Sequence, residues 1–281
     1  WPHALPRYKP ATSARDFRTS TAAPTAAAAA ATAANYSNDS QDALVRSLVA
    51  QALVRSPRVE AAMRAMDRRD FTSTHMGIPL HVSYSDAQVA IGQGATISAP
   101  SLHAVCLELL EAHAAPGAAV LDVGAGSGYL SGCLSLLVGD KGHVVALERQ
   151  ERLLDQAGWS LARALAIHFT SYASHRARPN PAAGPPGQPP ASGASGPRCV
   201  QLHNIELLHG NCLDDAVLAA AGGPFDAIHV GAAAREVPAQ LLALLRPGGR
   251  MVLPLGPPAG MQSLTVVDKA ADGAVTVLAV R

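Results

Sequence analysis

The stretch Val120-Leu-Asp-Val-Gly-Ala-Gly-Ser-Gly-Tyr129 decides the fold. Its apolar start predicts a buried strand, and the glycines at positions 124, 126 and 128 then allow a tight turn in which the backbone approaches a ligand closely. Residues 129–138 follow with apolar side chains at helical spacing. A strand, a glycine turn and a helix in this order indicate the opening unit of a nucleotide-binding α/β sheet.

Strands and helices alternate along the rest of the chain. Further strands are predicted at residues 143–148, 205–208, 225–230 and 250–255, and helices at 41–53, 57–66, 101–110, 151–174 and 237–245. Residues 67–94 are predicted to be irregular, whereas residues 263–268 and 274–280 predict a hairpin. The sequence therefore predicts a doubly wound, Rossmann-like α/β sheet with an antiparallel hairpin at one edge and extra N-terminal helices.

Composition sets the boundaries of this domain. Of the 281 residues, 48% are hydrophobic, which is enough for a large core. Residues 1–39, rich in Ala, Thr and Ser and poor in acids, predict either a disordered leader or an organelle transit peptide. Residues 40–281 form the predicted domain, with a disordered Pro/Gly-rich insertion at about residues 176–197.

Charge and cysteine usage exclude several function classes. The formal net charge is +1 and no cluster of Lys and Arg occurs, so a nucleic-acid partner is not expected. No apolar run is long enough to span a membrane. The four cysteines, with no Cys-x-x-Cys pair among them, suggest neither a zinc site nor disulfides. We expect a protein of a reducing compartment such as the cytoplasm, or of an organelle such as the chloroplast if the leader targets it.

A second informative stretch is Ala95-Thr-Ile-Ser-Ala-Pro100. The proline favours an extended backbone before it and allows a helix to begin at Ser101. Thr96 and Ser98 therefore stand just before a helix N-terminus. Their hydroxyls either cap that helix or, with neighbouring backbone N–H groups, hold an anionic group.

The spacing of the glycines indicates which nucleotide is bound. Gly-x-Gly-x-Gly differs from the Gly-x-Gly-x-x-Gly pattern of dinucleotide sites, and Asp122 is poorly placed beside a pyrophosphate but well placed for an ammonium group. Glu148 ends the next predicted strand, where an acid accepts hydrogen bonds from ribose hydroxyls. The glycine spacing and Asp122 favour S-adenosylmethionine, which has an amino group and a sulfonium but no phosphate.

Four stretches together resemble the protein-L-isoaspartate O-methyltransferases. They are the glycine stretch, residues 94–100, Phe225-Asp-Ala-Ile-His-Val-Gly-Ala-Ala-Ala234 and Leu245-Arg-Pro-Gly-Gly-Arg-Met-Val-Leu-Pro-Leu-Gly256. The resemblance implies methyl transfer from S-adenosylmethionine to the free carboxylate of L-isoaspartyl residues in damaged proteins and peptides. It implies no metal, and we expect a monomer.

The resemblance also implies the site residues. Ser98 matches the family's active-site serine, to which we assign orientation of the substrate carboxylate. The implied cofactor-binding residues are Ala95, Thr96, Ile97, Ser98, His103, Gly124, Gly126, Ser127, Glu148, Arg149, Asn211 and Cys212, and Asp122 joins them from the ammonium argument above. His229, near the end of a central strand, is interpreted as a satisfied core or pocket-wall histidine rather than a base.

Two departures from the family pattern keep alternatives open. Asn211-Cys212 stands where the family usually has Asp-Gly, which predicts lower affinity for adenine. The chain also stops at Val280-Arg281, where the family continues, so we expect the edge hairpin to be incomplete and the C-terminus truncated. The alternatives are a methyltransferase of the same fold that acts on a small molecule, and a cofactor-binding protein that has lost activity.

Overall fold

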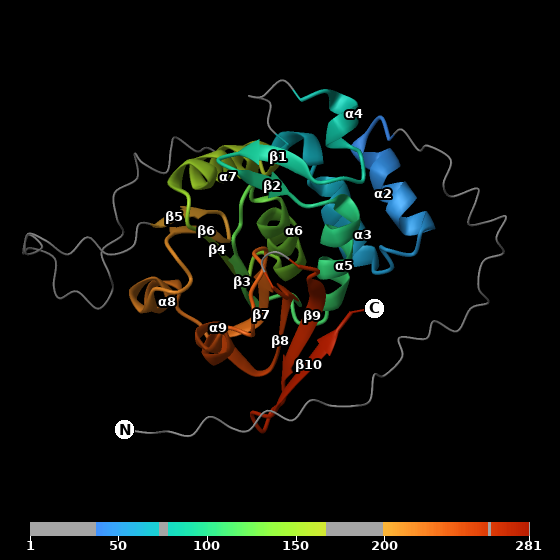
Figure 1. Ribbon diagram of the computed structural model, residues 1–281. Coiled ribbons are helices and arrows are strands. Elements are labelled where there is room, and N and C mark those ends of the chain that lie inside the picture. Colours follow the sequence, from blue (N-terminus) through green and yellow to red (C-terminus); the bar gives the residue numbers. More distant parts are fainter. Residues whose placement is uncertain (1–37, 73–77, 167–198, 258–259, 281) are drawn as a thin grey trace, which may run out of the picture.

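The strand that precedes the glycines lies in the middle of an eight-stranded sheet (Figure 1). The computed structural model describes residues 38–72, 78–166, 199–257 and 260–280. The strand order is β10-β9-β8-β7-β3-β4-β6-β5. These strands are β3 (Ala119–Val123), β4 (His143–Glu148), β5 (Cys199–Leu202), β6 (Ile205–His209), β7 (Phe225–Val230), β8 (Leu245–Leu255), β9 (Ser263–Lys269) and β10 (Val275–Ala279).

The centre of the sheet is parallel and both of its edges are antiparallel. Strands β6, β4, β3, β7 and β8 run parallel, and the predicted hairpin of β9 and β10 extends the sheet, with β9 antiparallel to β8 and β10 antiparallel to β9. At the other edge, β5, a strand that the sequence analysis did not predict, pairs antiparallel with β6. The prediction missed β5 because this four-residue strand directly follows the Pro/Gly-rich segment and is too short for its alternation of buried and exposed residues to stand out.

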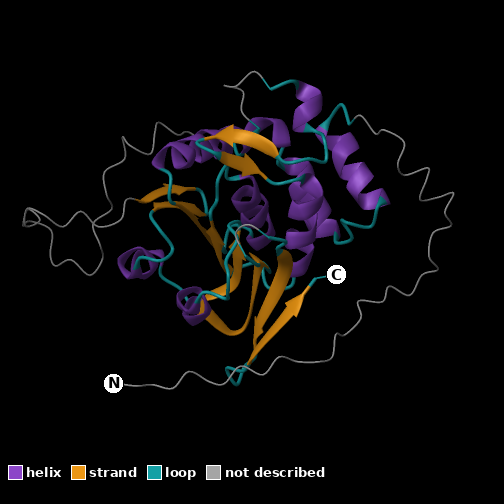
Figure 2. Cartoon of the chain, in the orientation of Figure 1, coloured by secondary structure: helices purple, strands orange, loops and turns teal. Residues whose placement is uncertain are grey.

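Helices cover both faces of the sheet (Figure 2). One face packs on α5 (Pro100–Leu110), α6 (Tyr129–Val138) and α7 (Glu151–Ala164), and the other on α8 (Asp215–Ala221) and α9 (Ala239–Leu244). Successive strand residues point to opposite faces, so Val120 and Leu121 belong to two separate hydrophobic clusters. None of the helices in the described residues is long and apolar enough to cross a bilayer.

The N-terminal helices form where the sequence predicts them. Helix α2 (Gln41–Ala50) has Ser40 as its N-cap, whose hydroxyl accepts a hydrogen bond from the N–H of Ala43 at 3.2 Å. Helix α3 (Pro57–Ala65) begins with proline in its first turn and packs against α2, α5 and α6. These helices add an outer layer on the α5–α6 side.

Helix α7 ends earlier than predicted. The pattern extends to residue 174, but the helix stops at Ala164, and Leu165 is its C-cap. Ala166 has φ 53°, a left-handed conformation that an α-helix cannot continue through. Residues 167–174, the predicted insertion at 176–197 and nearly all of the predicted leader lie outside the described residues.

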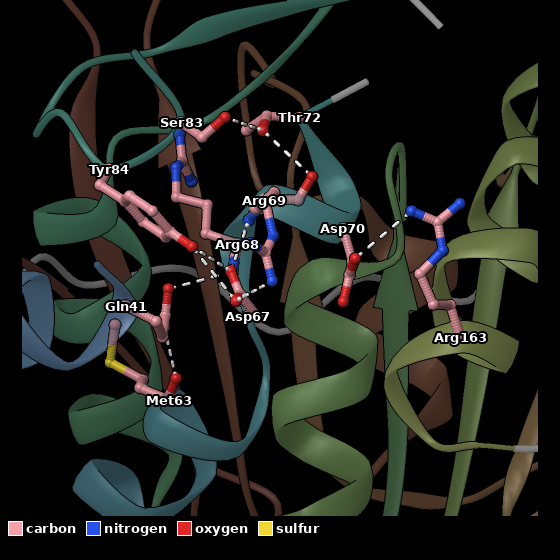
Figure 3. Close-up of polar contacts among 10 residues, drawn as sticks. All are labelled: Gln41, Met63, Asp67, Arg68, Arg69, Asp70, Thr72, Ser83, Tyr84 and Arg163. Atoms are coloured by element: carbon pink, nitrogen blue, oxygen red, sulfur yellow. Dashed lines mark hydrogen bonds and ion pairs between the residues drawn. The ribbon is translucent and has the colours of Figure 1, made fainter. Parts of the chain in front are cut away.

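Residues 67–94, predicted to be irregular, contain several short elements held together by side chains. They include η1 (Arg68–Phe71), α4 (Leu80–Ser83) and β1 (Val89–Gly92), which pairs with β2 (Ala95–Ile97). The Tyr84 hydroxyl donates to Asp67 Oδ1 at 2.9 Å, and Thr72 donates to Ser83 at 2.6 Å (Figure 3). Polar contacts of this kind leave no apolar periodicity, so the sequence pattern could not reveal these elements.

Candidate active site

Three neighbouring parallel strands end together at the predicted glycine loop. The N–H of Gly124 donates to the carbonyl of Leu147 in β4, and the N–H of Gly231 donates to the carbonyl of Val123 in β3, both at 2.8 Å. From β3 the chain continues to β4 on one side, whereas β7 and β8 lie on the other side. The loop therefore occupies the switch point of the sheet, where ligands of open α/β sheets bind.

The backbone of this loop requires glycine. Gly126 and Gly128 have φ values of 53° and 83°, a region that other residues seldom adopt. A Cβ added to Gly128 would also lie 3.1 Å from the Cβ of Ala157, because α7 packs closely there. A Cβ on Gly126 would lie 3.5 Å from Cδ1 of Ile91, which places the β1–β2 hairpin against the loop.

Glu148 lies at the end of β4 and is hydrogen-bonded to the glycine loop. Its carboxylate is 7% exposed and accepts hydrogen bonds from the N–H of Gly126 at 3.0 Å and of Gln150 at 2.9 Å. Its carbonyl accepts from the N–H of Gly210, the residue before Asn211. The structure thus brings the ends of β3, β4 and β6 together at the residues predicted for the cofactor.

The remaining predicted residues beyond β4 and β6 are more exposed. Arg149 is exposed, and its carbonyl is 3.0 Å from the His209 ring. The side chain of Asn211 is also exposed, with Oδ1 accepting from the N–H of Leu213 at 3.1 Å. Cys212 is half-buried, and burial raises the pKa of its thiol.

Residues 95–97 form β2, which pairs with β1, and Ser98 directly follows them. Ile97 is buried, Thr96 is exposed, and Ala95 and Ser98 are half-buried. Neither Thr96 nor Ser98 caps α5, because the N-cap is Ala99 and the N–H of Ser101 donates to Oδ1 of Asp86 at 2.8 Å. The capping alternative is therefore wrong for both hydroxyls.

Two more of the predicted residues are buried near the start of α6. His103 is 7% exposed, and its ring is stacked on Tyr129 with 5.0 Å between centroids. Burial, reinforced by the charges of Arg68 and His229, lowers the pKa of His103 well below its ordinary value, so the ring is neutral at pH 7. Ser127 is also buried, and its hydroxyl accepts from the N–H of Tyr129 at 3.4 Å.

Asp122 corrects the prediction made for it. The carboxylate is 1% exposed, with Oδ2 accepting from the Ser131 hydroxyl at 2.5 Å and Oδ1 lying 2.8 Å from Nδ1 of His229. Both oxygens are engaged inside the protein, so the carboxylate is not open to a ligand ammonium group as expected. His229 is a buried histidine with a hydrogen-bonded ring, as interpreted from the sequence.

The charge of His229 is set by its partners. Burial by itself lowers the pKa of His229, but the hydrogen bonds and charges of Asp122 and Cys106 outweigh it and raise the pKa to about 10. The sequence held a signal for this pair, because Asp122 and His229 each stand two residues before a glycine that follows a strand. Their pairing depends on β3 and β7 being neighbours, which the sequence analysis did not derive.

Arg68 is a second buried charge that the sequence analysis missed. Its side chain is fully buried in η1 and donates from Nη2 to the carbonyl of Ala87 at 3.0 Å. Burial lowers the pKa of Arg68 to about 10, so the guanidinium stays charged at pH 7. In the described residues, no group of three or more His, Cys, Asp or Glu could hold a metal ion.

A sequence comparison decides the family. The family described as Protein-L-isoaspartate(D-aspartate) O-methyltransferase (PCMT) matches residues 39–172 and 196–280. The chain belongs to this family. The match includes every loop at the carboxyl edge of the parallel strands, and it confirms the resemblance predicted from the sequence.

Curated members of the family are similar over most of this chain. Protein-L-isoaspartate O-methyltransferase 2 of Arabidopsis thaliana is 37% identical over 83% of this chain and 63% of the relative, so the chain spans less than two thirds of that protein. Protein-L-isoaspartate O-methyltransferase 1 of Arabidopsis thaliana is 34% identical over 86% of this chain and 87% of the relative.

Solved structures of the family share the fold. A protein-L-isoaspartate O-methyltransferase of Plasmodium falciparum, in complex with S-adenosyl-L-homocysteine, has a TM-score of 0.64 and 25% identity over 85% of this chain and 94% of its own. A further protein-L-isoaspartate O-methyltransferase has a TM-score of 0.60 at 22% identity, over 86% of this chain and 64% of that one. The predicted fold class is confirmed.

Proposed function

We propose that this PCMT-family protein transfers a methyl group from S-adenosylmethionine to the free carboxylate of L-isoaspartyl residues in damaged proteins and peptides. The observation that carries the proposal is the family match over residues 39–172 and 196–280. The resulting ester would cyclise without the enzyme to a succinimide, and hydrolysis of the succinimide would return part of the residue to normal aspartate.

The residues at the switch point fit S-adenosylmethionine. The loop of residues 124–128 contains no Lys or Arg to hold a phosphate, and Glu148 offers a fixed carboxylate to ribose hydroxyls. The Plasmodium falciparum relative was solved with S-adenosyl-L-homocysteine, the same molecule without its methyl group. When bound, S-adenosylmethionine would supply a methyl group activated by a sulfonium.

We assign cofactor binding to the predicted residues other than Asp122. Asp122 is left out because both of its carboxylate oxygens are engaged inside the protein. The assigned residues are Ala95, Thr96, Ile97, Ser98, His103, Gly124, Gly126, Ser127, Glu148, Arg149, Asn211 and Cys212.

The protein's own contribution to catalysis is alignment. A substrate carboxylate with an ordinary pKa of about 4 is already ionised at pH 7, so methyl transfer to it needs no general base. We assign the Ser98 hydroxyl to donating a hydrogen bond that orients this carboxylate, since Asp86 and not Ser98 caps α5. Holding the reacting atoms in line in a site without water supplies the rate enhancement.

Transfer of a tritiated methyl group tests the proposal. The enzyme is incubated with labelled S-adenosylmethionine and either an isoaspartyl peptide or the matching aspartyl peptide. Labelling of the isoaspartyl peptide alone is expected. Equal labelling of both peptides would contradict the repair function, whereas tight cofactor binding without transfer would favour the alternative of a protein that has lost activity.

We also propose a monomer of the cytoplasm. The formal net charge of +1 suggests no nucleic-acid partner, and the four cysteines suit a reducing compartment. An organelle remains the alternative because of the acid-poor composition of residues 1–37, which lie outside the described residues. Sedimentation of the purified protein and N-terminal mapping of the mature protein test the two proposals.

A further inference from the structure

Asp122 and His229 form a buried pair just before two neighbouring loops, the glycine loop of residues 124–128 after β3 and the loop of residues 231–234 after β7. They are cross-strand partners in β3 and β7, with 2.8 Å between Oδ1 and Nδ1. Two residues beyond His229, a Cβ added to Gly231 would lie 2.9 Å from the carbonyl oxygen of Gly124. The backbones of the two loops are therefore in close contact just beyond the pair.

Both helices that follow the site also contact the pair. Helix α6, which follows the glycine loop, contributes the Ser131 hydroxyl, which donates to Asp122 Oδ2 at 2.5 Å. Helix α5, which follows Ser98, contributes the thiol of Cys106, in hydrogen-bonding contact with His229. The titratable and charged groups that face the pair are Cys106 and His103 from α5 and Cys133 from α6.

The charge of the pair bears on the reaction. Methyl transfer brings a cationic sulfonium together with an anionic carboxylate, so a net charge close to both would attract one reactant and repel the other. A lone buried carboxylate is costly, whereas a carboxylate with a protonated histidine at hydrogen-bond distance is compensated. Asp122 with His229 is such a compensated pair, and His103 beside it is neutral.

We propose that Asp122 and His229 form a positioning element for methyl transfer. The pair fixes the loops of residues 124–128 and 231–234 relative to each other, and it keeps the protein beneath them free of net charge. This inference rests on the proposed function. It assigns to His229 the positioning of the reacting groups and no contact with them.

Three variants, made from two substitutions, separate the charge of the pair from its hydrogen bond. His229→Asn keeps an N–H donor near the position of Nδ1 but removes the positive charge, and Asp122→Asn removes the negative charge. The double variant Asp122→Asn/His229→Asn is neutral and retains a donor and an acceptor. Arg250→Gln is the matched control, because it breaks an ion pair with Asp268, at 2.7 and 2.8 Å, between β8 and β9 of the same sheet.

We expect His229→Asn to lower kcat by about tenfold to a hundredfold, the loss that follows a small misplacement of reacting groups. The KM for S-adenosylmethionine should change less than about threefold. The double variant should recover part of the lost kcat, and Arg250→Gln should keep the kcat of the wild type.

Two results would overturn the inference. In the first, the folded His229→Asn protein has the wild-type kcat at every pH and only its melting temperature falls. That result would show that the role of His229 is purely structural. In the second, the double variant is no more active than His229→Asn. If the wild-type protein binds S-adenosylhomocysteine but methylates no isoaspartyl peptide, the proposed function is overturned and this role with it. If the wild type is active and the variants are unaffected, only the positioning role is overturned.

Discussion

Oε2 of Glu148 accepts a hydrogen bond from the backbone N–H of Gly126 at 3.0 Å, which joins the end of β4 to the middle of the glycine loop. Oε1 accepts from the N–H of Gln150 at 2.9 Å. Two backbone donors therefore fix the orientation of a carboxylate that is only 7% exposed. The carboxylate is held in place before any ribose hydroxyl donates to it, which reduces the entropy lost on binding.

Glu148→Gln should weaken binding of S-adenosylhomocysteine by about tenfold to a hundredfold. The amide would turn an N–H₂ group towards one of the two backbone donors and remove a charge-assisted acceptor, a loss of about 1.5–3 kcal/mol. Isothermal titration calorimetry measures the change. Glu206→Gln is the control. The Glu206 carboxylate lies 3.6 Å from Nε2 of His143, which pairs with Ala119 at the start of β3, whereas the glycine loop follows the other end of that strand. Equal losses in both variants would contradict a specific role for Glu148.

Ser98→Ala should lower kcat for an isoaspartyl peptide by about tenfold or more while leaving the affinity for S-adenosylhomocysteine largely intact. The hydroxyl is assigned to alignment of the substrate carboxylate, and poor alignment reduces the rate more than binding. Steady-state kinetics and calorimetry on the same preparation separate the two effects. Ser101→Ala, three residues on in the first turn of α5, should keep full activity. A Ser98→Ala protein that loses the cofactor and keeps peptide affinity would show that the assignment is wrong.

Much of the fold could be predicted because apolar strands and their flanking glycines are local signals. The strand before Gly124 is apolar on both faces, as buried parallel strands are, and it formed as expected. Strand β5 was missed because its four residues carry no such signal. The end of α7 was missed because the left-handed conformation of Ala166 is unusual for alanine and no glycine or proline marks it.

The candidate site was predicted only in part, because some of its relationships depend on the order of the strands. The placement of Glu148 beside Gly126 follows from a single strand–loop–helix–strand unit, which the sequence shows directly. The pairing of Asp122 with His229 joins residues 107 positions apart and needs β7 to lie next to β3. Considered alone, Asp122 appeared open to a ligand, and only its neighbours show that it is not.

Gly128→Ala should destabilise the protein more than Gly117→Ala. Both glycines have a positive φ, 83° and 89°, so each substitution incurs the backbone cost of about 1–2 kcal/mol. Only the new Cβ at residue 128 would approach Ala157 and Leu161, at 3.1 and 3.2 Å, whereas nothing lies within 4 Å at residue 117. Urea denaturation should give a larger loss for Gly128→Ala by about 1 kcal/mol or more. A greater loss for Gly117→Ala would contradict the close packing of α6 on α7.

The His229–Asp122 pair should make the stability of the wild type fall with rising pH. The pKa of His229 is about 10 in the folded protein, above its ordinary value of 6.5, so the folded state holds a proton that the unfolded chain releases. The stabilisation is complete below pH 6.5 and is lost as the pH rises through 10, by at most about 1.4 kcal/mol per pH unit. Urea denaturation of the wild type and of Asp122→Asn/His229→Asn at pH 7, 8 and 9 measures this loss as a change in the difference between their free energies of unfolding.

The contribution of Tyr84, whose pKa is raised to about 12 by burial and Asp67, is present in both proteins and cancels in that difference. A difference that stays constant over this range would show that His229 is not the protonated partner of Asp122.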